Sequence, residues 1–260
     1  YNKYHGMLHY GQRLPHTKWC VLRYPNGSMA QLSGMSTEAF EDFYFASNCI
    51  DYQKLNEIAC ALNKLCARTD RVRIVAPGTD LSFSIKGMCQ EESYCGIFNR
   101  PCGETGMNIV QGTANGTIRY NIPSGFQGFV FTDVELTLED GVVVNATSNH
   151  TEAMNKILDT AQGARRIGEF AIGFNPLITQ PITDTLFDEK MAMSLHFTPG
   201  NGGENKSAIH WDLVQSHAPK MGGGEIWFDD VLIRKDGLFL PQELQCMNPE
   251  NLIKEICEEA

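Results

Sequence analysis

The sequence predicts a mixed α/β protein in which antiparallel strands predominate, and three observations support this fold class. One segment, residues 51–67, has apolar residues at helical spacing. Short runs in the second half alternate between polar and apolar residues, and turn signals such as Glu139-Asp140-Gly141 join them. The strand expected at residues 71–75 is followed by no G-x-G-x-x-G sequence, so nothing indicates a parallel dinucleotide-binding sheet.

The first third of the chain is expected to be mainly helical. Residues 1–18 carry His5, His9 and His16 among glycine and proline, and we interpret them as a loop without a metal site. Residues 19–24 are apolar enough for a short strand, which Pro25-Asn26-Gly27 would end as a turn. Ser36 or Thr37 is a suitable N-cap for a helix whose aromatic residues would enter the core. The helix of residues 51–67 and the strand of residues 71–75 together resemble the end of an α/β unit.

The rest of the chain alternates strands with one helix. After a strand at residues 81–85, residues 87–116 are rich in cysteine and glycine and are expected to be irregular. Residues 151–167 are expected to be helical, and Asn175-Pro176 would interrupt the chain. Further strands are expected at residues 117–122, 129–138, 142–147, 193–197, 207–214, 225–228 and 231–234. The result is one mixed domain from about residue 70 to 240, preceded by a helical piece.

Composition excludes several classes of partner. A net charge of −10 over 260 residues argues against nucleic acid or an anionic membrane surface. No apolar run is long enough to span a membrane, and the start shows no basic-then-apolar signal peptide. Nine cysteines without a C-x-x-C pair suit free thiols in a reducing cytosol, so we expect a cytoplasmic protein. Cys89, Cys95 and Cys102 are spaced too widely for a typical structural zinc site.

The strand expected at residues 207–214 carries a pair of potential metal ligands. In an extended strand, His210 and Asp212 point to one face, while Ile209, Trp211 and Leu213 point to the other. An imidazole and a carboxylate placed in this way can bind one metal ion together. The alternative is a hydrogen bond between the two side chains that only fixes a half-buried histidine. The choice depends on whether further ligands converge on the pair.

Further polar residues with ligand chemistry stand between apolar or glycine neighbours. They are found in the runs 101–104, 168–171, 186–190 and 194–197, which include Glu104, Glu169 and His196. Charged side chains in such surroundings must be paired or coordinated, because burying them uncompensated costs several kcal/mol. Carboxylates and two histidines can hold two divalent ions if one carboxylate bridges them. Spacing alone does not show that these residues converge.

Several of these runs resemble the signature blocks of one family, the thermophilic-type metalloaminopeptidases (aminopeptidases T and S). The resemblance extends in order from about Lys18 to Phe239. The blocks are Met-Ser-Thr-Glu-Ala-Phe-Glu-Asp-Phe-Tyr-Phe (35–45), Pro-Gly-Thr-Asp-Leu (77–81), Gly-Ala-Arg-Arg-Ile-Gly-Glu-Phe-Ala-Ile-Gly-Phe-Asn-Pro (163–176), Leu-Phe-Asp-Glu-Lys (186–190), Leu-His-Phe (195–197) and Asn-Lys-Ser-Ala-Ile-His-Trp-Asp (205–212). The resemblance implies removal of N-terminal residues from peptides by two divalent ions, zinc or cobalt, with magnesium or manganese as further options.

The resemblance also implies which residues bind the metals. Matching by motif, the ligands fall on Glu169, His196, His210 and Asp212, and Asn99-Arg100-Pro101-Cys102-Gly103-Glu104 nominates Glu104 as a ligand or general base. Two features depart from the family pattern. The Phe-Thr-Ala-Pro-like run after that glutamate is replaced by Thr105-Gly106-Met107-Asn108, and a tyrosine expected about seven residues after His196 is replaced by Asn201-Gly202-Gly203-Glu204.

The resemblance further implies the organisation and partners of the protein. Residues 1–70 would be the end portion of an N-terminal α/β domain, and residues 71–260 the metal-binding catalytic domain. A peptide is the expected substrate, and a homodimer is the expected assembly. Two alternatives remain: the ring-opening dihydroxypyridine dioxygenases resemble this family and use a His-x-Asp pair with one iron, and a decayed site could bind a peptide without turnover.

Overall fold

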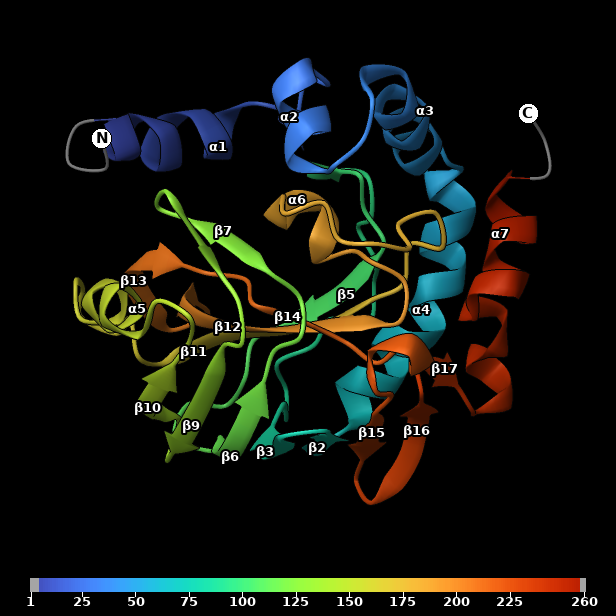
Figure 1. Cartoon of the computed structure of the whole chain (residues 1–260). Helices are drawn as coiled ribbons and strands as arrows, with labels where there is room; N and C mark the ends of the chain where they lie inside the picture. The colour runs from blue at the N-terminus through green and yellow to red at the C-terminus, as the bar shows by residue number, and fades with distance from the viewer. Residues whose placement is uncertain (1–4, 258–260) are drawn as a thin grey trace.

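The chain folds into a mixed α/β structure with two antiparallel sheets, which confirms the predicted fold class (Figure 1). This computed structural model describes residues 5–257. The sheets occupy the lower and central part of the molecule in Figure 1, while α1, α2 and α3 lie above them and α4 and α7 lie at the right. Among the described residues, no helix is both long and apolar enough to cross a membrane.

The larger sheet has eight strands in the order β10-β9-β6-β3-β2-β15-β16-β17, and every neighbouring pair is antiparallel. The predicted hairpin is found, since Asp140 and Gly141 turn between β9 and β10, and a second hairpin turns at Asp229 and Asp230 between β15 and β16; all four residues have positive φ. Its strands are β2 (Arg71–Ala76), β3 (Thr79–Ser84), β6 (Asn115–Arg119), β9 (Glu135–Glu139), β10 (Val142–Thr147), β15 (Glu225–Phe228), β16 (Val231–Lys235) and β17 (Leu238–Phe239).

The smaller sheet has five strands in the order β13-β12-β11-β5, with β14 also paired to β12. It carries most of the candidate ligands. Its strands are β5 (Glu104–Met107), β11 (Ile167–Gly173), β12 (Ser194–Gly202), β13 (Asn205–His210) and β14 (Val214–Ser216). Two short pairs complete the strands: β1 (Val21–Leu22) with β4 (Asn99–Arg100), and β7 (Ser124–Phe126) with β8 (Phe129–Phe131).

The two sheets are joined by a common aromatic core. The ring of Phe83 on β3 lies 5.0 Å from that of Phe170 on β11 and 4.9 Å from that of Phe197 on β12. The buried Tyr120 hydroxyl donates a hydrogen bond of 2.8 Å to the carbonyl of Phe197. Because the small sheet packs against the large one through these fully buried rings, the strands that carry the site are held rigidly.

The helices surround the sheets, and side-chain caps start the two longest ones. Ser36 caps α3 and Asp51 caps α4 by accepting hydrogen bonds from backbone N–H groups of the first turn. The apolar face of α4, which includes Leu55, Ala59 and Leu62, packs into the same core as the sheets. The helices are a π-helix (His9–Arg13), α1 (Leu14–His16), α2 (Gly27–Leu32), α3 (Thr37–Asn48), α4 (Tyr52–Arg68), α5 (Thr151–Leu158), α6 (Thr185–Asp188), two 3-10 helices (Pro219–Met221 and Gln242–Met247) and α7 (Pro249–Cys257).

Several predictions about the first third of the chain are wrong. The expected loop contains helix from His5 to His16, whereas residues 1–4 lie outside the described part of the chain. The expected turn at Pro25-Asn26-Gly27 begins α2, because the Asn26 side chain accepts hydrogen bonds from the N–H groups of Ser28 and Met29. The strand after α4 belongs to an antiparallel hairpin with β3 rather than to a parallel α/β unit.

Other differences lie around the site. The expected helix of residues 151–167 ends at Leu158, and the chain re-enters the small sheet at Ile167. Between them, Gly163 has a positive φ and faces the Asn205 side chain so closely that a Cβ would lie 2.1 Å from Asn205 Oδ1. The segment 87–116, expected to be irregular, contains β4 and β5. The strand expected at residues 129–138 is broken at Asp133, which has a positive φ. The division of the chain near residue 70 stays a prediction.

Candidate metal centre

Four of the five residues nominated from the sequence lie on adjacent strands of the small sheet. Glu104 begins β5, Glu169 lies in β11, His196 in β12 and His210 at the end of β13. The register pairs Glu104 with Gly173 and His196 with Ala171, so along β11 these two residues and Glu169 stand at alternate positions, which face the same side of the sheet. His210 pairs with Gly200 on β12. Asp212 lies two residues beyond the end of β13. The prediction of one strand across residues 207–214 is therefore wrong, because β13 ends at His210.

The five side chains nevertheless converge. Nε2 of His210 lies 3.1 Å from Oδ1 of Asp212 and 3.5 Å from Oε2 of Glu169. Nε2 of His196 lies 3.8 Å from Oε1 of Glu169 and 4.0 Å from Oδ1 of Asp212. On the other side of the same ring, Nδ1 of His196 lies 3.8 Å from Oε2 of Glu104. Potential ligand atoms of Glu169, His196 and Asp212 all lie within 4.8 Å of one another, close enough to share a cation.

Hydrogen bonds from neighbouring residues orient these side chains. The hydroxyl of Thr198 donates to Oδ1 of Asp212 at 2.7 Å. Nδ1 of His210 lies 2.7 Å from the carbonyl oxygen of Asn201, a pure acceptor, so this nitrogen carries the proton and donates. The other nitrogen, Nε2, is then the one directed at the carboxylates. Such partners fix the tautomer and direction of a ligating histidine.

The carboxylates create a strongly negative potential that favours positive charge. Burial alone lowers the pKa of His196, but Glu169, Glu104 and Asp212 together raise it to about 10. Burial likewise lowers the pKa of His210, but Asp212, the Asn201 carbonyl and Glu169 raise it to about 9. Burial opposes ionisation of Asp212, yet the hydrogen bond from His210 and the charges of both imidazoles hold its pKa well below the usual range. Three carboxylates around two imidazoles are a donor set suited to a divalent cation.

Two unsatisfied buried atoms also fit a cation. Within residues 5–257, Oε2 of Glu104 and Nδ1 of His196 are buried and have no hydrogen-bond partner. Leaving a buried polar atom unpaired costs about 1–3 kcal/mol. A cation could use the lone pairs of Oε2, whereas Nδ1 of His196 offers one only when Nε2, the nitrogen that faces Glu169 and Asp212, carries the proton. The residues present therefore fit the group that the family resemblance implies.

Local backbone features make room for the ligands. Gly106 on β5 stands beside Glu169, and an added Cβ would lie 2.6 Å from Oε1 of that carboxylate. Gly103, at φ 142°, allows the chain to pass Asn175, where a Cβ would lie 2.7 Å from the Asn175 side chain. The fully buried Asn175 donates to the carbonyls of Cys102 and Ser47 and accepts from the N–H of Leu177. Asn175 thereby fixes the loop that leads into Glu104.

A pocket of about 350 Å³ opens beside the cluster, with Glu104 and Glu169 in its wall. Its remaining wall comes mainly from the segment 88–108. Glu92 adds a third carboxylate, and its Oε2 accepts a 2.5 Å hydrogen bond from the hydroxyl of Tyr94. Among the described residues that line this pocket there is no lysine or arginine. The pocket is therefore acidic and adjoins the candidate metal centre.

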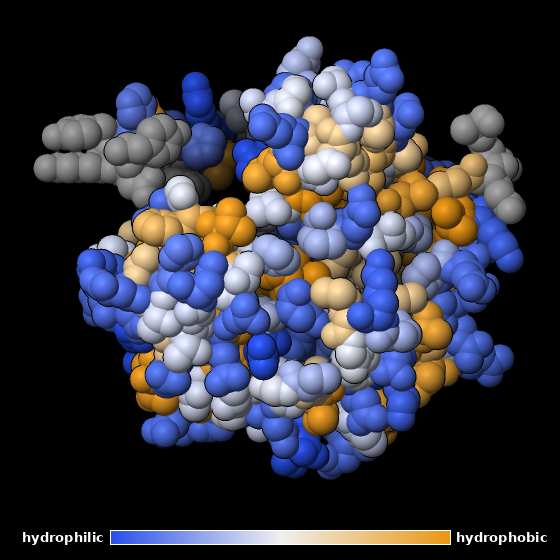
Figure 2. All heavy atoms as spheres, in the orientation of Figure 1, coloured by the Kyte–Doolittle hydropathy of each residue, from blue (hydrophilic) through white to orange (hydrophobic). Residues whose placement is uncertain are grey.

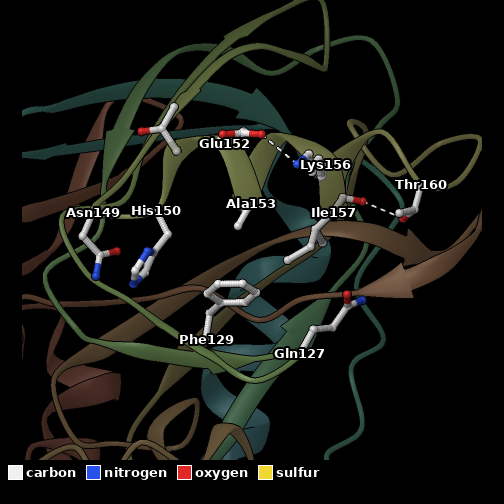
Figure 3. Close-up of a pocket in the computed structure, with 10 residues that line it drawn as sticks. Gln127, Phe129, Asn149, His150, Glu152, Ala153, Lys156, Ile157 and Thr160 are labelled. Carbon is white, nitrogen blue, oxygen red and sulfur yellow. Dashed lines mark hydrogen bonds and ion pairs between the residues drawn. The ribbon is translucent and has the colours of Figure 1, made fainter.

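A second pocket, of about 570 Å³, lies at the start of α5, away from the cluster (Figure 3). Its charged side chains already pair with each other, since Nζ of Lys156 lies 2.7 Å from Oε1 of Glu152. The ring of His150 packs 5.4 Å from that of Phe129. The lining residues bring no carboxylate to this histidine. Although larger, this pocket lacks the chemistry of the first.

The surface around α2 and α3 is the most hydrophobic part of the face seen in Figure 2. Most of that face is hydrophilic, especially over the strands of the large sheet. Leu32 and Phe45, on α2 and α3, are more than half exposed.

Two charged side chains beside the candidate ligands, Lys190 and Glu189, were not nominated from the sequence motifs. Nζ of the buried Lys190 lies 2.8 Å from Oε1 of Glu104 and also contacts the carboxylate of Glu189. The run 186–190 was noticeable as charge among apolar residues, but spacing could not show what it contacts.

In place of the family tyrosine, residues 201–204 form the tight hairpin between β12 and β13.

Comparison with solved structures shows the fold. The chain is similar to AmpT from Thermus thermophilus, with a TM-score of 0.68 and 20% identity over 86% of this chain and 65% of that one. A 2,5-dihydroxypyridine dioxygenase from Pseudomonas putida matches with a TM-score of 0.64 and 13% identity, covering 92% of this chain and 77% of that one. At these identities the likeness concerns the fold alone.

Comparison with curated proteins points to aminopeptidases. Aminopeptidase 2 of Geobacillus stearothermophilus is 37% identical over 145 residues, which is 47% of this chain and 33% of that protein. Aminopeptidase T of Thermus aquaticus is 29% identical over 146 residues, which is 48% of this chain and 34% of that protein. Each match spans about a third of the relative's length. The thermophilic metalloprotease (M29) family matches residues 9–239, nearly the whole chain, and the chain belongs to that family.

Proposed function

We propose that this chain forms the metal-binding part of an aminopeptidase that removes N-terminal residues from peptides. The observation that carries the proposal is the convergence of Glu104, Glu169, His196, His210 and Asp212 on one small volume. Membership in the metalloprotease family and the similarity to named aminopeptidases support it.

The five residues are proposed to bind two divalent ions, zinc or cobalt. The two oxygens of Glu169 face different histidines, Oε1 toward His196 and Oε2 toward His210, as a bridging carboxylate requires. Bound divalent ions supply a water of lowered pKa and polarise the scissile carbonyl. The protein contributes rigid ligands, and the hydrogen bonds from Thr198 to Asp212 and from His210 to the Asn201 carbonyl keep them in place.

The acidic pocket suits the amino end of a peptide. A free α-amino group is protonated near neutral pH, and with Glu104 and Glu169 assigned to the cations, Glu92 is the carboxylate of the described pocket lining that is left to receive it. This arrangement favours a positively charged chain end over an internal peptide bond, which is the selectivity of an exopeptidase. All nine cysteines are free thiols, which supports the proposed cytoplasmic location. The homodimer stays a prediction.

The dioxygenase alternative has weaker support. It rests on a likeness of fold at 13% identity. In addition, a mononuclear iron site needs only two histidines and one carboxylate. Here three carboxylates stand around the two histidines. Counting metal ions separates the alternatives, since the peptidase proposal expects two per chain and the dioxygenase one.

The deciding experiment is peptide hydrolysis by the purified full-length protein with added zinc or cobalt. Release of N-terminal residues from a panel of short peptides is expected, with none released after N-terminal acetylation. Absence of release from every peptide contradicts the proposal. The variant His210→Ala should lose at least one metal equivalent, while His150→Ala, in the distant pocket, should lose none; equal metal content in both would refute the ligand assignment.

A further inference from the structure

Lys190 has no role in the proposed reaction, yet it is among the most deeply buried charged residues of the chain. Its side chain is 0% exposed, and Nζ lies 2.8 Å from Oε1 of Glu104 while also contacting Oε1 of Glu189. An ammonium group is buried in this way only with compensating charges, because desolvation is costly. The two glutamates provide that compensation.

The contact with Lys190 makes the two oxygens of Glu104 different. Oε1 is occupied by the ammonium, whereas Oε2 is buried, lacks a hydrogen-bond partner among residues 5–257 and faces Nδ1 of His196 at 3.8 Å. A free carboxylate can bind a cation through one oxygen or through both. With Oε1 held, only Oε2 is directed at the other ligands.

The backbone positions of the two partners are fixed by one residue. The N–H of Asn175 donates to the carbonyl of Lys190 at 2.9 Å, and its side chain donates to the carbonyl of Cys102, two residues before Glu104, at 2.8 Å. On the Lys190 side, the buried Asp188 accepts the N–H of Ile182 at 2.7 Å and so ties the end of α6 to the loop that precedes this helix. The separation between Lys190 and Glu104 is therefore set by the fold.

We propose that Lys190 is a positioning residue that holds one oxygen of Glu104 and presents the other alone to a bound cation. The inference rests on the proposed role of Glu104 as a metal ligand. Glu189 is a second carboxylate in contact with the ammonium and helps to hold it in place.

A different role for Lys190 would have the opposite effect on binding. A lysine that served only to neutralise nearby carboxylates would repel the cation, so removing its charge would tighten cation binding. A lysine that positions Glu104 would, when removed, free that carboxylate to rotate and bind through both oxygens or neither. Cation binding would then weaken and the coordination geometry would change.

The test uses the double variant Lys190→Met/Glu189→Gln, which removes the ammonium together with the second carboxylate that contacts it. The matched control is Lys156→Met/Glu152→Gln, which removes an exposed ion pair of α5 far from the cluster. Glu189→Gln alone keeps the contact between Lys190 and Glu104. For each protein, cobalt(II) affinity and the visible absorption spectrum of bound cobalt(II) are measured, together with the melting temperature under chelator.

At least tenfold weaker cobalt binding and a changed cobalt spectrum are expected in the Lys190 double variant. The control and Glu189→Gln should keep the native spectrum. Unchanged or tighter binding with a native spectrum in the double variant would overturn the proposal, as would a chelated melting temperature that falls while the cobalt spectrum stays native. If the double variant does not fold, Lys190→Gln is measured in the same way and judged by the same outcomes.

Peptide hydrolysis is not among these measurements, so the two proposals fail separately. A protein that binds cobalt in a Lys190-dependent way but hydrolyses no peptide contradicts the aminopeptidase proposal and leaves this one standing. A peptidase whose cobalt site ignores Lys190 contradicts this inference alone. A native protein that binds no cobalt contradicts both.

Discussion

At the scale of single residues, the site is a balance of charges held in a small volume. His196 and His210 both face carboxylates, and this raises their pKa values to about 10 and about 9. Protons and divalent cations therefore compete for the same imidazoles. Their identities were predictable from the sequence through the family motifs, but their pKa values depend on distances that the sequence does not show.

Cation binding should strengthen as pH rises. Between pH 6 and 9, a cation must displace a proton from one or both imidazoles, so the apparent affinity should increase about 10-fold per pH unit for one proton and about 100-fold for two. Calorimetric titration in buffers of different ionisation enthalpy counts the protons released. A pH-independent affinity with no proton release would show that neither histidine is a ligand.

The chelated protein should show the opposite trend in stability. Both histidines have folded pKa values above the ordinary value of 6.5. Their contribution to the free energy of unfolding is therefore present in full below about pH 6.5 and lost as pH rises toward 9 and 10. Thermal melts under chelator from pH 6 to 10 should reveal this loss, and a flat profile would contradict the raised pKa values.

Gly106 gives a second test at this scale. In Gly106→Ala the new Cβ would lie 2.6 Å from Oε1 of Glu169, so that carboxylate must move and cation affinity should fall at least tenfold. Gly27→Ala is the control, because its added Cβ meets no atom closer than 3.9 Å. Equal affinities in the two variants would mean that the position of Glu169 is unimportant for the cation.

At the scale of elements, the sequence predicts the regular segments and the strands that carry His196 and His210, but it misses the two strands that carry Glu104 and Glu169. The helix at Tyr52–Arg68 and the hairpin of β9 and β10 follow clear periodicity and turn signals. By contrast, β5 begins after Cys102-Gly103 and holds Thr105 and Gly106, so its sequence shows no alternation of polar and apolar residues. The strand β11 is mostly apolar on both faces, because both faces are buried. Tertiary pairing, rather than local preference, makes these strands.

Asn175 follows β11 and links the loop before β5 to α3 through its side-chain hydrogen bonds. Asn175→Ala would leave the carbonyls of Cys102 and Ser47 and the N–H of Leu177 without their partner, which should cost about 2–4 kcal/mol of unfolding free energy. Urea unfolding of the chelated protein measures this loss. The exposed Asn149, which also bonds two backbone groups, is the matched control, and a similar loss in Asn149→Ala would refute a special role for Asn175.

At the scale of the whole molecule, the carboxylates of the site add to an already negative chain. The net charge is −10, and Glu104, Glu169, Glu189 and Asp212 are concentrated around Lys190 and two histidines. A cation that binds only the folded protein stabilises it in proportion to the logarithm of its concentration. The stability of this molecule is therefore expected to depend on divalent ions.

Added zinc or cobalt should raise the melting temperature in a concentration-dependent way. At 100 times the dissociation constant the stabilisation would reach about 2.7 kcal/mol, and a chelator should reverse it. Magnesium serves as a comparison, because nitrogen ligands favour zinc and cobalt over magnesium. A melting temperature that no divalent ion changes would contradict a metal centre in the folded protein.

The two walls of the acidic pocket come from different segments of the chain, so the sequence of one wall can change without altering the other. The ligands stand on a buried sheet, whereas the opposite wall comes mostly from the segment 88–102, which contributes only the short strand β4. Under the proposed function, chemistry and selectivity would therefore be built from different parts of the chain. Exchanging residues 88–99 with those of a relative should alter which peptides fit without disturbing the cation. In the proposed peptidase, substrate choice could thus diverge while the reaction stays the same.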